Sequence, residues 1–209
     1  MTTIPGLLAP AELTRLTLGA DAPAEFRVIG LDLSLRSTGV CLPDGTTYRI
    51  RTRDKDGDRR LVHIRSDIRD DLAEWQPHLV VIEDLPIHAK ASGITGMVHG
   101  VVRCELADAD VPYAYVVPAT LKKYATDNGN ADKREMAAAA YLAAGAEFPG
   151  DLNAKGEGGD MCDAWWLRAA GHDWCGLPLF TMPQDQRDRL SKAKWPERFL
   201  QRYVMGAAA

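Results

Sequence analysis

The sequence predicts an α/β protein built on a mixed five-stranded sheet flanked by helices. Two observations indicate this class. Three short apolar runs follow one another early in the chain with only turns between them, which predicts an antiparallel meander. Two later apolar runs are separated by helix-length segments instead, and sequential connections of that kind pack helices on both faces of a sheet.

The meander is expected over residues 26–32, 38–42 and 46–52. Pro43, Asp44 and Gly45 supply strong turn chemistry before its third strand. A helix follows and ends before Pro77, because apolar residues recur there at spacings of three and four. These residues are Leu61, Ile64, Ile68, Leu72 and Trp75.

The later elements alternate between strand and helix. Residues 79–83 are apolar throughout, as expected for an interior strand covered on both faces, and residues 111–117 form the fifth strand. Helices are expected over residues 91–107, 118–124, 131–144 and 159–170. The chain therefore divides into an N-terminal extension (1–25), one domain (26–172) and a partly helical tail (173–209), with helices expected over 184–194 and 196–205.

Length and composition suit one globular domain, since 46% of the 209 residues are hydrophobic and 26% are charged. No apolar run reaches the roughly 18 residues of a membrane helix, and the N-terminus lacks the pattern of a secretory signal. We therefore expect a cytoplasmic protein with no membrane partner. Its four scattered cysteines favour reduced thiols, and a zinc site would need Cys162, His172 and Cys175 with a fourth ligand.

Four acidic residues stand at the ends of predicted elements. Asp32 and Glu83 each close a buried strand, while Asp160 and Asp163 head the helix over residues 159–170. Residues three apart share one face of a helix. Converging carboxylates repel one another unless a cation lies between them, and hard divalent cations prefer oxygen ligands. The pattern predicts a site that binds Mg²⁺ or Mn²⁺ through these four side chains.

Simpler roles compete with metal binding. A strand-end carboxylate can cap the next turn, and Asp160 suits a helix N-terminus. A charge that ends an apolar strand is costly to bury unpaired, however, and an N-cap does not explain a second aspartate one turn later. The hydroxyl-rich turn formed by Ser34, Ser37 and Thr38 can either hold phosphate or only satisfy the backbone, and both alternatives stay open.

Basic residues gather in two stretches. They are Arg49, Arg51, Arg53, Lys55, Arg59 and Arg60 in the first, and Lys122, Lys123, Lys133 and Arg134 in the second. Both are interleaved with aspartate, so either can be a solvated face, but we expect at least one to contact DNA. The net charge of −4 excludes a passive nucleic-acid coat rather than a nuclease, because metal-binding carboxylates enter that count.

The helix expected over residues 91–107 carries a stripe of small residues. Gly93, Gly96 and Gly100 recur at spacings of three and four. Isolated glycines cost about 1 kcal/mol each in a helix, so close packing against another backbone is expected to offset that loss. The other backbone is either the chain's own sheet or a second copy of the protein.

Four segments, in this order, resemble RuvC-type Holliday junction resolvases. Residues 30–40 (GLDLSLRSTGV) are similar to the family's first acidic strand, and residues 81–86 (VIEDLP) to its second. Residues 118–123 (PATLKK) with 129–133 (GNADK) resemble its basic loop and helix, and residues 160–164 (DMCDA) its closing Asp-x-x-Asp-Ala helix. The resemblance covers about residues 27–172, and the N-terminal extension and the tail have no counterpart in it.

The resemblance implies a ribonuclease H-like fold, a homodimer and metal-dependent cutting of four-way DNA junctions or other branched DNA. Carried over by position, Asp32, Glu83, Asp160 and Asp163 are ligands of Mg²⁺ or Mn²⁺, with two ions expected. Lys133, together with Lys122 or Lys123, would approach DNA phosphate. Such a crossover junction endodeoxyribonuclease acts in recombination and repair.

Two other functions are weighed against this one. An actin-like ATP-binding protein also has an acidic turn after its first strand, but residues 33–35 (LSL) lack the glycine that close phosphate approach needs. A catalytically inactive protein that only binds branched DNA is the other alternative, and the presence of all four acids argues against it.

Overall fold

The structure is a computed structural model of the chain and describes residues 26–85, 92–149 and 158–196. The N-terminal extension and nearly all of the helix expected over residues 196–205 lie outside the described residues. Among the residues that are described, no helix is long and apolar enough to cross a membrane.

The centre of the molecule is one five-stranded sheet. Its strands are β1 (Val28–Asp32), β2 (Ser37–Cys41), β3 (Thr47–Arg51), β4 (Leu79–Glu83) and β5 (Tyr113–Val116). They are ordered β3-β2-β1-β4-β5. β1, β2 and β3 pair antiparallel, whereas β1, β4 and β5 pair parallel. The predicted mixed sheet that begins with a meander is therefore confirmed.

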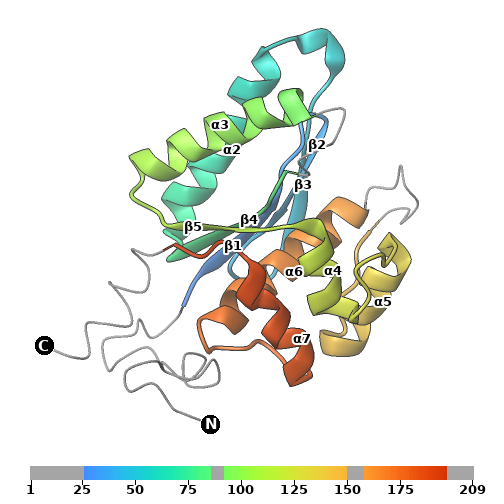
Figure 1. Ribbon diagram of the computed structural model, residues 1–209. Helices are drawn as coiled ribbons and strands as arrows, with labels where there is room; N and C mark the ends of the chain where they lie inside the picture. The colour runs from blue at the N-terminus through green and yellow to red at the C-terminus, as the bar shows by residue number, and fades with distance from the viewer. Residues whose placement is uncertain (1–25, 86–91, 150–157, 197–209) are drawn as a thin grey trace, which may run out of the picture.

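Helices cover both faces of the sheet, as Figure 1 shows. One layer contains α2 (Arg59–Trp75) and α3 (Ser92–Asp108). The other contains α4 (Pro118–Thr126), α5 (Lys133–Ala144), α6 (Gly158–Trp174) and α7 (Gln184–Asp188). Two 3₁₀ turns, Asp54–Asp56 and Arg189–Lys192, complete the described elements.

The core is divided by the sheet into two apolar clusters, because successive side chains of a strand point to opposite faces. Val28 and Val81 belong to the cluster under α6, while Ile29 and Val80 belong to the cluster under α2 and α3. All four side chains are fully or almost fully buried. The uninterrupted apolar runs of β1 and β4 thus reflect burial on both faces.

Several helix boundaries differ from the expected ones. The helix expected over residues 184–194 is an α-helix only over Gln184–Asp188 and continues as a 3₁₀ turn at Arg189–Lys192. α5 begins at Lys133, not at residue 131, because Asp132 forms a capping box with Glu135 and so fixes the helix start. α6 continues to Trp174 instead of ending at Ala170. Gly171 does not terminate it: a Cβ atom there would lie 2.7 Å from Val28, so this glycine brings the helix close to the sheet.

The segment after α6 packs onto the domain. Its residue Lys194 pairs with Tyr115 on the outer side of β5 through two backbone hydrogen bonds of 2.9 and 3.0 Å. Trp195 stacks on Trp174 with ring centroids 4.6 Å apart, and Leu190 is buried. We call residues 177–196 the C-terminal segment; it covers part of one edge of the sheet.

Candidate active site

Asp32 and Glu83 lie next to each other at the carboxyl edge of the sheet. β1 and β4 are parallel neighbours, and their register pairs Leu31 with Ile82, so the residue that follows in each strand is an acid. The carboxyl ends of parallel strands are where α/β proteins place their ligands. Two of the four predicted site residues are therefore brought together by strand register alone.

α6 brings the other two acids to the same place by lying directly on the strands. A Cβ atom on Gly30 would be 2.0 Å from the carbonyl oxygen of Ala164, and one on Gly39 would be 2.1 Å from that of Asp160. No side chain fits at either position, so the helix backbone rests on β1 and β2. Asp160 and Asp163, in the first turns of α6, thus reach the end of β1.

The carboxylates are close enough to change one another's ionisation. Burial, followed by the charges of Glu83 and Asp163, raises the pKa of Asp32 well above its ordinary value. Burial and the charge of Asp163 raise the pKa of Glu83 to about 8, although a hydrogen bond with Asp32 opposes this rise. Burial raises the pKa of Asp163 to about 6. Burial, and then the mutual repulsion of the acids, therefore favours the protonated form of these carboxyl groups.

Two lysines supply part of the missing positive charge. Lys133 Nζ lies 2.9 Å from Asp160 Oδ1. Burial alone would lower the pKa of Lys133, but this hydrogen bond and the neighbouring acids raise it. The charge of Lys122 lowers the pKa of both Glu83 and Asp163.

Lys123, the third predicted DNA-binding lysine, lies elsewhere. It is exposed, and its side chain lies against Gly129 in the loop that precedes α5. Two of the three lysines therefore lower the pKa of acids in the carboxylate cluster. A contact between Lys123 and DNA phosphate stays a prediction.

The donor chemistry of the cluster suits a hard divalent cation. It offers carboxylate oxygens, and a bound cation would offset the burial and the mutual repulsion that raise the pKa of these groups. Across residues 26–85, 92–149 and 158–196, however, no three His, Cys, Asp or Glu side chains converge on one point in the way ligands of a bound metal do. Lys133 binds one oxygen of Asp160 in this arrangement, so a cation that used Asp160 would compete with an ammonium group.

Comparison with known proteins identifies the fold. No family profile matches the sequence. Two solved structures of Thermus thermophilus RuvC, one of them in complex with a Holliday junction substrate, superpose with a TM-score of 0.59 and cover 82% of this chain and 99–100% of theirs. This chain has the RuvC fold. Their sequence identity to it is only 17% and 18%.

Relatives named crossover junction endodeoxyribonuclease RuvC are also similar in sequence. The protein from Azoarcus sp. is 28% identical over 120 residues, and that from Hydrogenovibrio crunogenus is 24% identical over 120 residues. These alignments span 53% of this chain and 66% and 70% of the two relatives. The chain is therefore similar to RuvC in sequence as well as in fold.

The hydroxyl-rich turn of this RuvC-like chain satisfies the backbone. Ser34 Oγ donates to the carbonyl of Ser37 at 2.9 Å, and Thr38 Oγ1 donates to the carbonyl of Ser34 at 2.7 Å. These bonds close the turn between β1 and β2, immediately after Asp32. The turn therefore fixes the end of β1, and the hydroxyls of Ser34 and Thr38 both donate to its backbone.

The sequence interpretation overlooked two features of the site. Gly30 and Gly39 seat α6, and a glycine inside a strand pattern is a recognised signal of close backbone approach. Lys194 binds Asp84, the neighbour of Glu83, with Nζ 2.7 Å from Oδ2. No sequence signal connects those two residues, which are 110 positions apart.

The raised pKa values predict how stability depends on pH when no metal is bound. Glu83 has a pKa of about 8, against an ordinary 4.5, so the folded state binds its proton more tightly than the unfolded state does. The stabilisation that comes from protonated Glu83 is fully present below its ordinary pKa of 4.5 and is lost as pH rises through about 8. We expect the melting temperature of metal-free protein to fall between about pH 7 and about pH 8.5, and Mg²⁺ to offset most of the fall.

Differential scanning fluorimetry with and without Mg²⁺ measures this effect. The range above pH 7 avoids His172, whose burial lowers its pKa to about 4 and which therefore affects stability only at lower pH. Glu83→Gln serves as the matched control and should flatten the dependence. A melting temperature that stays level across this range in the wild type would contradict the prediction.

Proposed function

We propose that this protein is a structure-selective endodeoxyribonuclease that hydrolyses phosphodiester bonds in Holliday junctions or other branched DNA. The observation that carries the proposal is that Asp32, Glu83 and Asp163 lie within electrostatic reach of one another, with raised pKa values, at the carboxyl edge of a RuvC-type sheet. Relatives that bear the name crossover junction endodeoxyribonuclease and a RuvC structure that contains a Holliday junction support the same activity.

Mg²⁺ or Mn²⁺ is the proposed cofactor. Asp32, Glu83, Asp160 and Asp163 would hold it, and four carboxylates provide enough oxygen donors for two ions. Such ions activate a water molecule and stabilise the leaving oxygen of a phosphodiester. The carboxylates lie at the ends of two strands and on one helix, so the ligands are held by rigid elements.

Lysines provide the phosphate contacts. Lys133 and Lys122 lie within electrostatic reach of the carboxylates, and Lys123 is exposed on the same helix as Lys122. Lysine holds phosphate as a point charge without reading bases. Recognition by these residues would depend on the path of the DNA backbone and hence on the shape of the branch.

The decisive test is a cleavage assay on matched DNA substrates. Purified protein is incubated with a four-way junction, a flap, a fork and a linear duplex, each with and without Mg²⁺. We expect incision of branched DNA only when the metal is present. Binding without incision in Mg²⁺ and in Mn²⁺ would favour an inactive branched-DNA-binding protein, and ATP binding without DNA binding would favour an actin-like protein.

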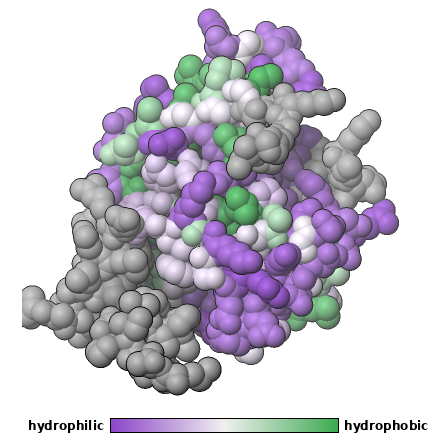
Figure 2. All heavy atoms as spheres, viewed as in Figure 1, coloured by the Kyte–Doolittle hydropathy of each residue, from purple (hydrophilic) through white to green (hydrophobic). Residues whose placement is uncertain are grey.

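We further propose that the protein acts as a homodimer joined through α3. Ile94 and Met97 are 51% and 45% exposed on this helix, and Figure 2 shows apolar patches over the layer of α2 and α3. Among the described residues, nothing lies within 4 Å of a Cβ built on Gly93, Gly96 or Gly100. The glycines therefore do not pack on the chain's own sheet, which leaves them available to a second copy related by a two-fold axis.

Met97→Asp is expected to shift the protein to a monomer, because a two-fold interface would place two new charges near each other. Light scattering at micromolar concentration measures the mass, which is 22.9 kDa for one chain. Val62→Asp is the matched control, since Val62 is a 62% exposed apolar residue on the neighbouring helix. A wild type that is monomeric yet cuts both strands of a junction symmetrically would contradict the dimer.

A further inference from the structure

The carboxylate cluster is aligned with an arginine across the sheet. Asp32 of β1 pairs with Gly39 of β2, and Gly39 pairs in turn with Arg49 of β3. Residues paired across neighbouring strands point to the same face of a sheet. Asp32, Gly39 and Arg49 therefore form one row on the face that α6 covers, with the first turn of the helix above the glycine.

β3 divides its side chains between the two faces of the sheet. Tyr48 and Ile50 pack in the cluster under α2, and the Tyr48 hydroxyl donates to Asp71 of that helix. Alternation then places Arg49 and Arg51 on the opposite face, beside α6. Arg49 donates from Nη1 to Ser37 Oγ at 3.4 Å. This contact directs its guanidinium toward the end of the sheet where Asp32 lies, while Arg51 is exposed.

Positive charge thus borders the carboxylates on both sides. Asp32 and Glu83 end β1 and β4, which are adjacent inner strands of the sheet. Lys122 follows β5, one edge strand, in α4, whereas Arg49 and Arg51 belong to β3, the other edge strand. A DNA strand that crosses the end of the sheet would meet a lysine first, then the acids, and then the arginines.

We infer that Arg49 and Arg51 bind the phosphates of the DNA strand that is cut, on the side of the cut facing β3. Arg49 is two strands from Asp32, or about 10 Å at about 4.8 Å per strand. Phosphates of one strand recur every 3.4 Å along a duplex axis and lie farther apart along the strand itself, so the contact falls within about three phosphates of the scissile bond. The inference rests on the proposed nuclease function and adds a second phosphate-binding surface to it.

The alternative is that these arginines are only exposed to solvent on an edge strand and bind no DNA. Arginine is suited to phosphate because its planar guanidinium can donate two parallel hydrogen bonds. Arginines that are only solvent-exposed would make no position-specific contact with DNA, so the two alternatives differ in a measurable way.

The test combines a protein variant with a DNA modification. Binding of Arg49→Gln/Arg51→Gln to a four-way junction is measured without divalent metal over a series of salt concentrations. We expect the slope of log affinity against log salt to fall by about 1.8, or about 0.9 for each phosphate lost. A neutral methylphosphonate is placed in turn at each position within about three phosphates of the cut. At one of these positions it should weaken binding by the wild type and leave the double variant unaffected.

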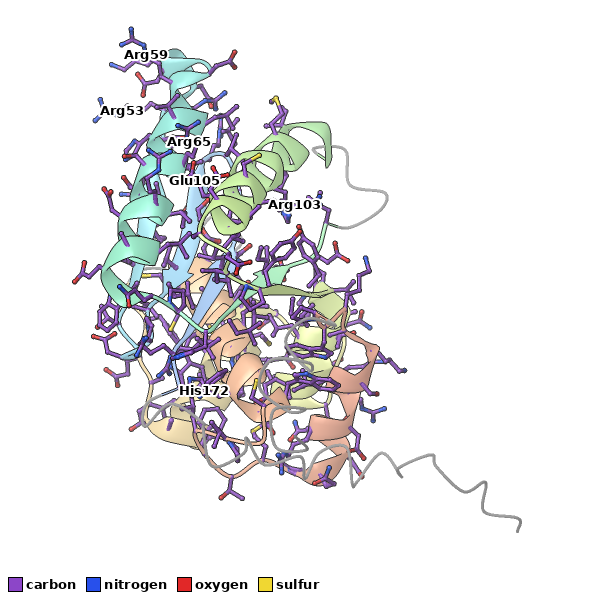
Figure 3. The ribbon with its side chains drawn as sticks, turned by 90° about the vertical axis from the view of Figure 1, so that its left-hand side faces the viewer. Arg53, Arg59, Arg65, Arg103, Glu105 and His172 are labelled. Carbon is purple, nitrogen blue, oxygen red and sulfur yellow. The ribbon has the colours of Figure 1, made fainter. Side chains whose placement is uncertain are left out.

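Arg59→Gln is the matched control. Arg59 is exposed at the start of α2, in the layer on the other side of the sheet (Figure 3), and its replacement removes an arginine charge as each change in the double variant does. An unchanged slope in the double variant would overturn the inference while the nuclease function stood. So would a fall in slope for Arg59→Gln as large as the fall per arginine in the double variant. A wild type that neither binds nor cuts branched DNA would overturn the proposed function itself.

Discussion

Glu83→Gln is expected to abolish Mg²⁺-dependent cutting of a four-way junction while junction binding survives. Asp32→Asn and Asp163→Asn should behave in the same way. Each change removes a charge that would hold the cation, whereas the phosphate contacts belong to lysines and arginines. The loss should exceed about a hundredfold, because partners in the outer shell of a metal site alone are worth about 10–100-fold. Cleavage and band-shift assays on the same preparation measure both effects.

Glu83→Gln should raise the thermal stability of the protein although it abolishes cutting. Since burial and mutual repulsion raise the pKa of Glu83, the neutral glutamine should melt at a higher temperature than the wild type when metal is absent at about pH 8. Asp84→Asn is the control, because that side chain binds Lys194 and its loss should spare most of the activity. Near wild-type cutting by Glu83→Gln would remove Glu83 from the site.

Gly39→Ala is expected to damage both folding and activity, although it adds a single methyl group. The new Cβ would lie 2.1 Å from the carbonyl oxygen of Asp160 and 2.5 Å from its carbonyl carbon. These are backbone atoms, so the first turn of α6 must move as a whole and carry Asp160 and Asp163 away from Asp32. Overpacking of this kind costs about 1–3 kcal/mol, and occasionally more.

Gly93→Ala provides the comparison. It makes the same chemical change in α3, and none of the described residues lies within 4 Å of the added atom. Replacing a helical glycine by alanine should stabilise the single chain slightly, by up to about 1 kcal/mol, so both variants are unfolded by urea in the monomeric Met97→Asp background, where the proposed α3 interface is absent. Urea unfolding and junction cleavage of both variants measure the contrast. A Gly39→Ala protein as stable and active as the wild type would show that α6 can move without consequence.

The strands and two of the site acids could be predicted because their signals are local. β4 was expected over residues 79–83 and occupies Leu79–Glu83, since an apolar run between turn residues has few alternatives. Its acid is placed by the end of the strand, and parallel register then brings Asp32 beside Glu83. Here local pattern and global topology agree, and such agreement is what makes an element predictable.

Other features depend on contacts that no local pattern encodes. α6 runs past Gly171, where Val28 and Val81 leave no room for a side chain, although a glycine at that point resembles a helix end. The C-terminal segment is held by Asp173, which is buried and binds Arg187 at 2.5 Å and the Tyr124 hydroxyl at 3.1 Å. Such tertiary contacts override local signals in the sequence, such as a glycine that would predict a helix end.

The two edges of the sheet have a consequence for how copies of this protein can associate. Open edge strands are templates for pairing with another chain. On β5, backbone groups of Tyr115 are already bonded to Lys194 of the C-terminal segment. On β3, Arg49 and Arg51 would meet arginines of a second β3 if two such edges paired, and like charges directly opposite are unfavourable. Both routes to a continuous intermolecular sheet, and to aggregation by that route, are therefore obstructed, whereas association through a helical face such as that of α3 stays open.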